Sequence, residues 1–202
     1  MKKITLSIAS FIILTLGVSL EANSQVVTQG SSHIFVGYGL PNIPAMVVTA
    51  LGAGGGSSFG PFVASYQYGV IDKLAIGGQI GYASGTSSDQ TWTEFNGSSI
   101  VTQHYLLTLS IVTVMAKADY HYLSSDKADL YSGLMVGYGI ASVSTSGTKD
   151  PSGATISAGG TSYAITAIGF RYIFTDNIGA YADLGYGVNG IITVGVSAKF
   201  GK

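Results

Sequence analysis

Three ionisable side chains alternate with apolar residues in the segment AKADYHYLSSD at 116–126. Lys117, Asp119 and His121 are two residues apart, so an extended strand would place all three on one face. An amine, a carboxylate and an imidazole on one face can transfer protons, hold an ion or pair with one another. Which of these applies depends on what this face contacts.

Further polar residues with the same placement occur on other predicted strands: Gln67, Arg171, Asp183 and Lys199. Asp119 and Asp183 are the expected counter-ions. Arg171 should reach Asp183 across the turn at 175–176, because diagonal neighbours on paired strands lie about 7–8 Å apart. We therefore predict one polar cluster inside the fold, made of Gln67, Lys117, Asp119, His121, Arg171, Asp183 and Lys199.

The histidines give weaker indications of catalysis. His33 lies near Ser31 and Ser32, and His104 precedes Ser110, but neither forms a Ser–His–acid arrangement along the chain. The three histidines also lack the spacing of metal ligands. We predict no catalytic residue, no cofactor and no metal site, and hence a protein that is not an enzyme.

The composition restricts the environment of the chain. Of 202 residues, 47% are hydrophobic and 9% are charged, and the formal net charge is −1. A soluble domain usually has about 25–35% charged residues on its surface, and a nucleic-acid partner normally requires a basic patch. The absence of cysteine excludes disulfides, thiolate metal sites and a cysteine nucleophile.

The N-terminus has the organisation of an export signal. Lys2 and Lys3 precede an apolar run at 4–18, and small residues follow at 22–24. This run is shorter than the roughly 20 residues of a membrane-spanning helix. The sequence thus predicts a cleavable signal peptide at 1–24, read by the Sec pathway, and one exported domain at 25–202.

Two short patterns recur in alternation along that domain. The first is VGYG or a close variant, at 36–39, 80–83, 136–139 and 184–187. The second is an aromatic–polar–aromatic triplet, at 66–68, 120–122 and 170–172, with a relaxed copy at 198–200. Alternation with a period of two surrounds both patterns, which indicates strands throughout.

These repeats predict an all-β fold, an eight-stranded antiparallel up-and-down transmembrane β-barrel. The triplets lead into short turns, whereas three of the opposite connections are long, at 40–60, 84–104 and 142–160. Short turns at one end and long loops at the other are typical of outer-membrane barrels. The long loops are expected to face the cell exterior, where they could bind a surface partner.

The aromatic residues indicate which face of the strands meets lipid. Two outward-facing girdles are predicted, one at the loop end (Tyr38, Tyr82, Tyr138, Tyr186) and one at the turn end (Tyr68, Tyr122, Tyr172, Phe200). Two girdles flanking an aliphatic band match a bilayer. A soluble lipocalin-like barrel is the alternative, but its exterior would then be rich in Gly and Ala. The polar cluster accordingly faces the lumen.

These features resemble small bacterial outer-membrane barrels of the OmpA/OmpX/OmpW type, and most closely the "outer membrane protein beta-barrel" or porin-like family of Bacteroidetes-type bacteria. The resemblance covers about 26–202 and rests on pattern, and Phe200 stands near the end where such families usually finish in an aromatic. It implies a Gram-negative outer-membrane location, insertion by the barrel-assembly machinery, and roles in envelope integrity, adhesion or small-solute passage.

The expected function is a structural or surface-interaction role for an outer-membrane barrel whose narrow lumen is plugged by charges. One alternative is a passive porin-like channel in which Lys117, Arg171 and Lys199 bias ion selectivity. A second is a lipid-modifying enzyme, which would need an outward-facing catalytic cluster near the loop end.

Overall fold

The computed structural model describes residues 26–148, 155–188 and 190–201. The predicted signal peptide at 1–24 lies outside the described residues. No helix within the described ranges is long and apolar enough to cross a membrane.

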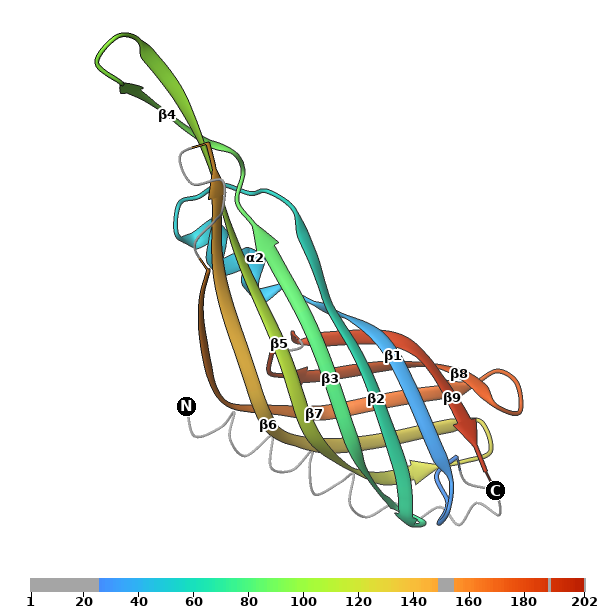
Figure 1. Ribbon diagram of the computed structural model, residues 1–202. Helices are drawn as coiled ribbons and strands as arrows, with labels where there is room; N and C mark the ends of the chain where they lie inside the picture. Colours follow the sequence, from blue (N-terminus) through green and yellow to red (C-terminus); the bar gives the residue numbers. More distant parts are fainter. Residues whose placement is uncertain (1–25, 149–154, 189, 202) are drawn as a thin grey trace, which may run out of the picture.

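Eight antiparallel strands close into a ring (Figure 1). In chain order they are β1 (Ser32–Leu40), β2 (Ser58–Ile71), β3 (Leu74–Thr86), β5 (Ile100–Ser124), β6 (Ala128–Gly147), β7 (Thr155–Ile173), β8 (Ile178–Tyr186) and β9 (Ile192–Phe200). The β1–β9 and β3–β5 pairings close the ring. A further strand, β4 (Gln90–Phe95), pairs with β5 outside it. The predicted eight-stranded up-and-down barrel is confirmed.

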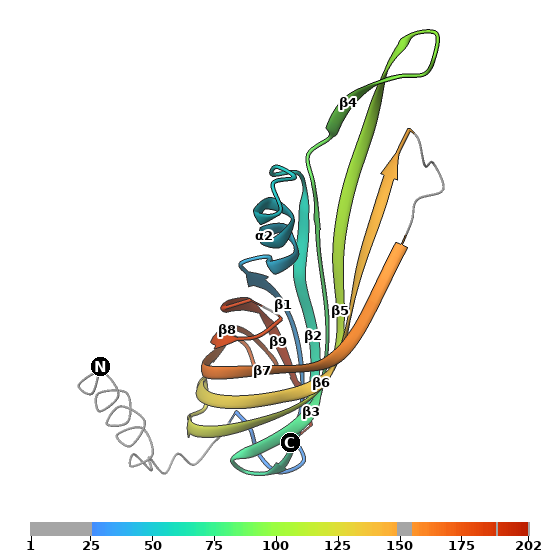
Figure 2. The same ribbon diagram turned by 90° about the vertical axis from the view of Figure 1, so that its left-hand side faces the viewer.

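The wall of this barrel is uneven in height. β5 has 25 residues and β6 has 20, whereas β1, β8 and β9 have 9 each. The last residue of β8, Tyr186, pairs with Ile165 of β7, so β7 continues above the end of β8. Figure 2 shows β5, β6 and β7 rising far beyond β8 and β9. We call the part formed by residues 83–86, 90–95, 100–111, 141–147 and 155–158 the protruding sheet.

This sheet corrects the prediction of long loops at 84–104 and 142–160. Most of both ranges is strand, because hydroxyl and apolar side chains continue to alternate there with a period of two. Ser/Thr-rich segments of this kind resemble loops in composition, although Thr and the β-branched residues between them favour strands.

The connection at 40–60, predicted as a long loop, contains a short helix, α2 (Ile43–Ala50). Asn42 caps this helix by accepting a hydrogen bond from the Ala45 N–H at 2.9 Å. The Asn42 amide also donates to the carbonyls of Phe59, Gly60 and Ser84, which fixes α2 above the barrel mouth. The helix is eight residues long and therefore escapes a search for helical periodicity.

The two faces of the wall follow the predicted alternation. On β5, Thr113, Met115, Lys117, Asp119 and His121 are buried, while the residues between them are exposed. One additional residue in β7 shifts the register between Thr166 and Ile168. This bulge changes the parity of β7, so that both Thr166 above it and Arg171 below it point into the lumen.

Candidate functional site

The lumen holds a network of buried ionisable side chains at its turn end. The Arg171 guanidinium pairs with the Asp129 carboxylate at 2.6 Å, and both side chains are fully buried. His121 contacts the same carboxylate through Nδ1 at 2.9 Å. Charge-assisted hydrogen bonds of this length are strong, but burying both charges is costly. Removing one partner would leave the other charge buried and uncompensated, so the fold depends on both residues.

His33 joins this network to the segment that precedes β1. The Ser31 hydroxyl donates to the Thr28 carbonyl at 2.7 Å and lies 3.0 Å from His33 Nε2. Because that hydroxyl proton is already used, His33 Nε2 is the donor toward Ser31. His33 Nδ1 is then free to accept from the Arg171 guanidinium, which lies 3.0 Å away. The contacts define a neutral His33 with its proton on Nε2.

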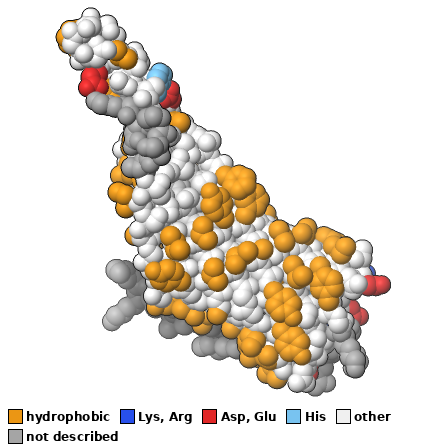
Figure 3. All heavy atoms as spheres, in the orientation of Figure 1, with side chains coloured by type: hydrophobic (Ala, Val, Ile, Leu, Met, Phe, Trp, Pro, Cys, Tyr) orange, Lys and Arg blue, Asp and Glu red, His pale blue; other side chains and the backbone are white. Residues whose placement is uncertain are grey.

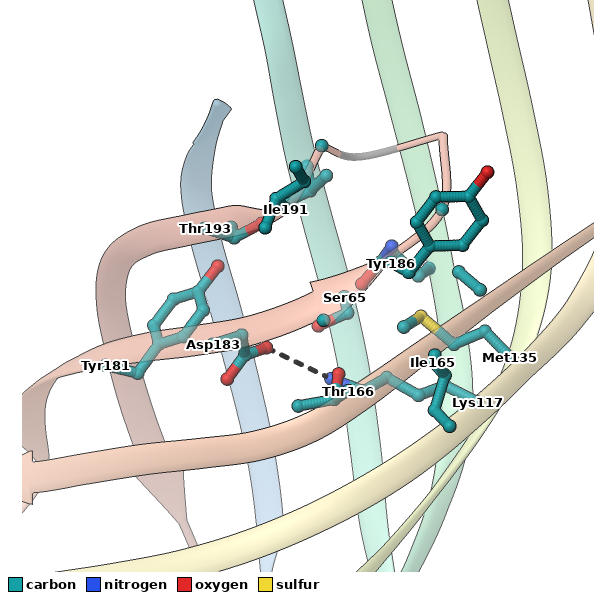
Figure 4. Close-up of a pocket in the computed structure, with 16 residues that line it drawn as sticks. Ser65, Lys117, Met135, Ile165, Thr166, Tyr181, Asp183, Tyr186, Ile191 and Thr193 are labelled. Carbon is teal, nitrogen blue, oxygen red and sulfur yellow. Dashed lines mark ion pairs between the residues drawn. The ribbon is translucent and has the colours of Figure 1, made fainter. Parts of the chain in front are cut away.

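A second group of charges lies on the loop side of the first. Lys117 Nζ is 3.1 Å from Asp119 and 3.9 Å from Asp183. The Asp119 carboxylate accepts from the Gln67 amide, and Asp183 accepts from the Tyr131 hydroxyl, each at 2.5 Å. Figure 4 shows Lys117 extending toward Asp183 from the opposite wall. Residues from four strands thus meet across the lumen.

An apolar layer covers this second group. Met115, Met135 and Ala164 form a buried cluster, and Val188 from the β8–β9 turn packs against it. A cavity of about 30 Å³ remains beside Lys117 and Asp183 (Figure 4). A water molecule needs about 10–15 Å³ of such space, so this cavity could hold two or three waters at most. It is too small for a solute.

Most of the predicted cluster lies in the lumen. Gln67, Lys117, Asp119, His121 and Arg171 are at most 4% exposed. Asp183 also faces inward, with a side chain 13% exposed, whereas Lys199 is only partly buried near the end of β9.

The predicted pairing of Arg171 with Asp183 needs correction, because the structure pairs Arg171 with Asp129. Asp129 lies directly opposite Arg171 in the β6–β7 register, which is closer than a diagonal neighbour. Sequence reasoning missed Asp129, His33 and Tyr131. A signal was present for the first, since Asp129 shares its parity with the inward-facing Gly133.

The predicted girdle residues lie on the outer face of the wall. Six of them are 41–77% exposed, while Tyr38 and Tyr122 are partly buried. At the loop end, Tyr38 and Tyr82 are joined by two aromatics that the sequence patterns missed, Phe59 and Phe62. The Tyr38 and Phe62 ring centroids are 5.0 Å apart, and those of Phe59 and Phe62 are 4.7 Å apart.

The remaining histidine, His104, belongs to the protruding sheet. Its Nδ1 lies 2.7 Å from Asp89, and both side chains are about half exposed. Among the described residues, no group of three or more His, Asp or Glu side chains is placed to hold a metal ion.

Comparison with known proteins gives distant likenesses. No protein-family model matches the chain, and no curated protein matches it. Among solved structures, it is similar to Ail, the attachment invasion locus protein of Yersinia pestis, which was solved alone and in complex with the heparin analogue sucrose octasulfate. The complex has 15% identity and a TM-score of 0.48, and the match covers 86% of this chain and 100% of Ail. The structure of Ail alone has the same identity and coverage with a TM-score of 0.47.

It is also similar to the N-terminal β-barrel domain of Pseudomonas aeruginosa OprF. The identity is 18% and the TM-score 0.42, and the match covers 85% of this chain and 98% of that domain. These likenesses are too distant to assign a function or a partner.

Proposed function

We propose that the protein is an integral barrel of a bacterial outer membrane, with a structural or surface-interaction role and a lumen closed by its own side chains. The observation that carries this proposal is an abrupt end to the apolar exterior. Across β3, β5, β6 and β7, the row Tyr82–Val112–Ile140–Gly159 is followed outward by Ser84–Ser110–Ser142–Ser157. The next outward row is again all hydroxyl: Thr86, Thr108, Ser144 and Thr155.

The apolar band below these rows is somewhat shorter than the band of about 25 Å that outer-membrane barrels present to lipid. Along β5 the apolar exterior extends from Tyr120 to Val112. At about 3.3 Å per residue this is about 26 Å of strand, or about 20 Å along the normal for a tilt of about 40°. In Figure 3 hydrophobic side chains cover the barrel wall, and the protruding sheet above is mostly free of them. The aromatic residues at both ends complete the pattern of a lipid-facing surface.

The closed lumen is supported by three consecutive layers of side chains. They are the Arg171–Asp129 pair, the Lys117 group and the apolar layer around Met115. Because these layers bury charged and apolar side chains inside the ring, they leave little room for a permanent aqueous path. The protein would then act through its exterior, and no catalytic step is required of it.

The protruding sheet is the part through which a surface partner would be contacted. It carries an exposed Trp92 and Phe95 beside the His104–Asp89 pair. Export by the predicted signal peptide and insertion by the barrel-assembly machinery belong to the same proposal, because a barrel of this kind must reach the outer membrane unfolded and close there.

Single-channel conductance in a planar bilayer tests the proposal. The mature protein is refolded, its insertion is verified by heat-modifiable migration on gels, and it is compared with Arg171→Ala. We expect no steady conductance from the inserted wild type. A steady current whose size or ion selectivity changes in Arg171→Ala would establish the passive channel instead. Failure to insert would refute the membrane location itself.

A further inference from the structure

Above the barrel rim the polarity of the sheet is reversed. The inner face of the protruding sheet, which continues the lumen wall, carries two consecutive apolar rows. They are Ala83–Ile111–Ala141–Ala158 and Gly85–Leu109–Val143–Ile156. The same four strands present the serine and threonine rows on their outer face. A sheet whose outer side is polar and whose inner side is apolar has its hydrophobic surface turned away from the surrounding water.

The reversal takes place within two residues along each strand. One row below Ile111, the inner face still carries Thr113, which is 2% exposed. The next row down is mixed, because Gln79 and Ser162 are buried and polar and share it with the buried Met115. The apolar rows are therefore a separate feature and not part of the charged lumen.

Helix α2 covers one half of this apolar inner face. It packs against β3 at Gly85, where a side chain would collide with the Ala45 backbone, and Val48 is 1% exposed. The half formed by β6 and β7 is left open, with Val143 39% and Ile156 75% exposed. Helix α2 and the open half of the sheet thus present a partly exposed apolar surface above the barrel mouth. We call it the cradle, defined by Val143, Ile156 and Ala158 with α2 opposite.

The cradle is continuous with the lipid-facing surface over the low wall of the barrel. Within the described residues, the β7 edge from Thr155 to Ala164 has no strand beside it, because β8 ends at Tyr186. The rim below this edge is apolar, with Tyr186 77% and Ile191 50% exposed. An outer-wall groove of about 780 Å³, lined by Tyr163, Ile165 and Tyr186 among others, reaches the foot of the same edge. The groove is mainly apolar, with Lys117 as the one charged residue among those that line it, so a largely apolar surface leads from the membrane band toward the cradle.

We propose that the cradle binds a hydrocarbon chain of an outer-leaflet lipid, which enters sideways over the β8–β9 rim. The inference rests on the proposed membrane location. The inner rows carry neither charge nor side-chain hydrogen-bonding group, so a polar ligand or an ion would gain nothing there. A hydrocarbon chain would instead bury the exposed apolar surface of Val143 and Ile156, and this burial favours binding.

The test places a tryptophan on each surface in turn and measures its contact with lipid. In a Trp92→Phe background, which removes the natural tryptophan, three reporters are made: Ile156→Trp in the cradle, Ser157→Trp on the outer serine row, and Tyr163→Trp in the membrane band. Positions 156 and 157 are neighbours on β7 that face opposite sides, so they are matched in height. The variants are refolded in phosphatidylcholine vesicles with or without bromine on the acyl chains, and fluorescence quenching is recorded.

We expect strong quenching at position 163, at least half as much at position 156, and little at position 157. No quenching at 156 beside strong quenching at 163 would overturn the cradle proposal while leaving the membrane location intact. Quenching at 157 equal to that at 156 would also overturn it, because lipid would then surround the whole sheet. No quenching at 163 would refute the membrane location on which the inference depends.

A second pair of variants separates a lipid chain from other occupants. Ala158→Asp, added to the Ile156→Trp protein, should reduce quenching at 156 several-fold, whereas the neighbouring Ser157→Asp should leave it unchanged. If position 156 is shielded from aqueous iodide but not quenched by the brominated chains, a second copy or a peptide segment fills the cradle, and the lipid proposal is wrong.

Discussion

The buried Arg171–Asp129 pair provides the sharpest test of how this barrel is held together. Arg171→Met removes the guanidinium and leaves a fully buried carboxylate whose remaining neighbour is His121. It also removes the hydrogen bond to His33 Nδ1 and the stacking of the guanidinium on Phe35, where the distance to the ring centroid is 5.2 Å. Breaking a buried pair from one side costs about 3–5 kcal/mol. We expect a loss of that size in the free energy of unfolding.

The double variant Arg171→Met/Asp129→Leu should recover part of this loss. An apolar pair of similar volume avoids the uncompensated charge, although the unpaired nitrogens of His33 and His121 would each cost about 1–3 kcal/mol. The losses in free energy of unfolding of Arg171→Met and Asp129→Leu should therefore sum to at least about 2 kcal/mol more than the loss of the double variant. This difference is the coupling energy of the pair. Lys127→Met, which changes an exposed turn residue, is the control and should stay within about 0.5 kcal/mol of the wild type.

Reversible urea unfolding in lipid vesicles, followed by circular dichroism and by migration of unboiled samples on gels, measures these quantities. An Arg171→Met protein within about 1 kcal/mol of the wild type would show that the pair is solvated or dispensable. Strictly additive single variants would show that Arg171 and Asp129 act separately. Either result would refute the role of the Arg171–Asp129 pair as a buried, coupled interaction that closes the turn end of the lumen.

Three further predictions use matched substitutions. Gly133→Ala should destabilise the barrel by about 1–3 kcal/mol, because the new methyl group meets the Asp119 carboxylate, whereas Gly78→Ala on the outer face, with its nearest atom at 3.6 Å, should be tolerated in the same unfolding assay. Val136→Lys should cost about 2–4 kcal/mol on insertion in lipid, while Ser146→Lys, on the outer face of the protruding sheet, should cost less than about 0.5; equal costs would contradict the membrane boundary drawn at the serine row. Asn42→Ala should release α2, because the Asn42 amide donates hydrogen bonds to three carbonyls. Limited proteolysis within 43–57 should then be faster, while the main unfolding transition stays the same. Thr49→Ala is the control and should leave proteolysis unchanged.

The strand ring and its two faces were predictable because the alternation is local. Lys117, Asp119 and His121 had to share a face with one another and not with Tyr120, whatever the partners of β5. The recurring Gly-Tyr and aromatic triplets then set the number of strands. These statements need no knowledge of how the strands are aligned.

Pairing between charges on different strands depended on the register of those strands and could not be predicted from the sequence. Arg171 and Asp183 are joined by a short turn, so their proximity could be inferred, but Asp129 opposes Arg171 through a connection whose length leaves the register open. The bulge between Thr166 and Ile168 moves the parity of β7 as well. The contact of His33 with Arg171 joins residues 138 positions apart and follows only from closure of the ring.

The protruding sheet shows what the alternation of side chains cannot predict. Alternation divides a strand into two faces, but it does not state which medium each face contacts. On β5 the odd-numbered side passes from His121 and Lys117 in the lumen to Leu109 and Ile111 above it, while the even-numbered side passes from Val112 to Ser110. The alternation of side chains keeps its period of two along β5, but the medium that each face contacts changes from one segment to the next. A strand longer than the bilayer is thick must therefore be interpreted segment by segment, and the point where both faces exchange polarity marks where it leaves the membrane.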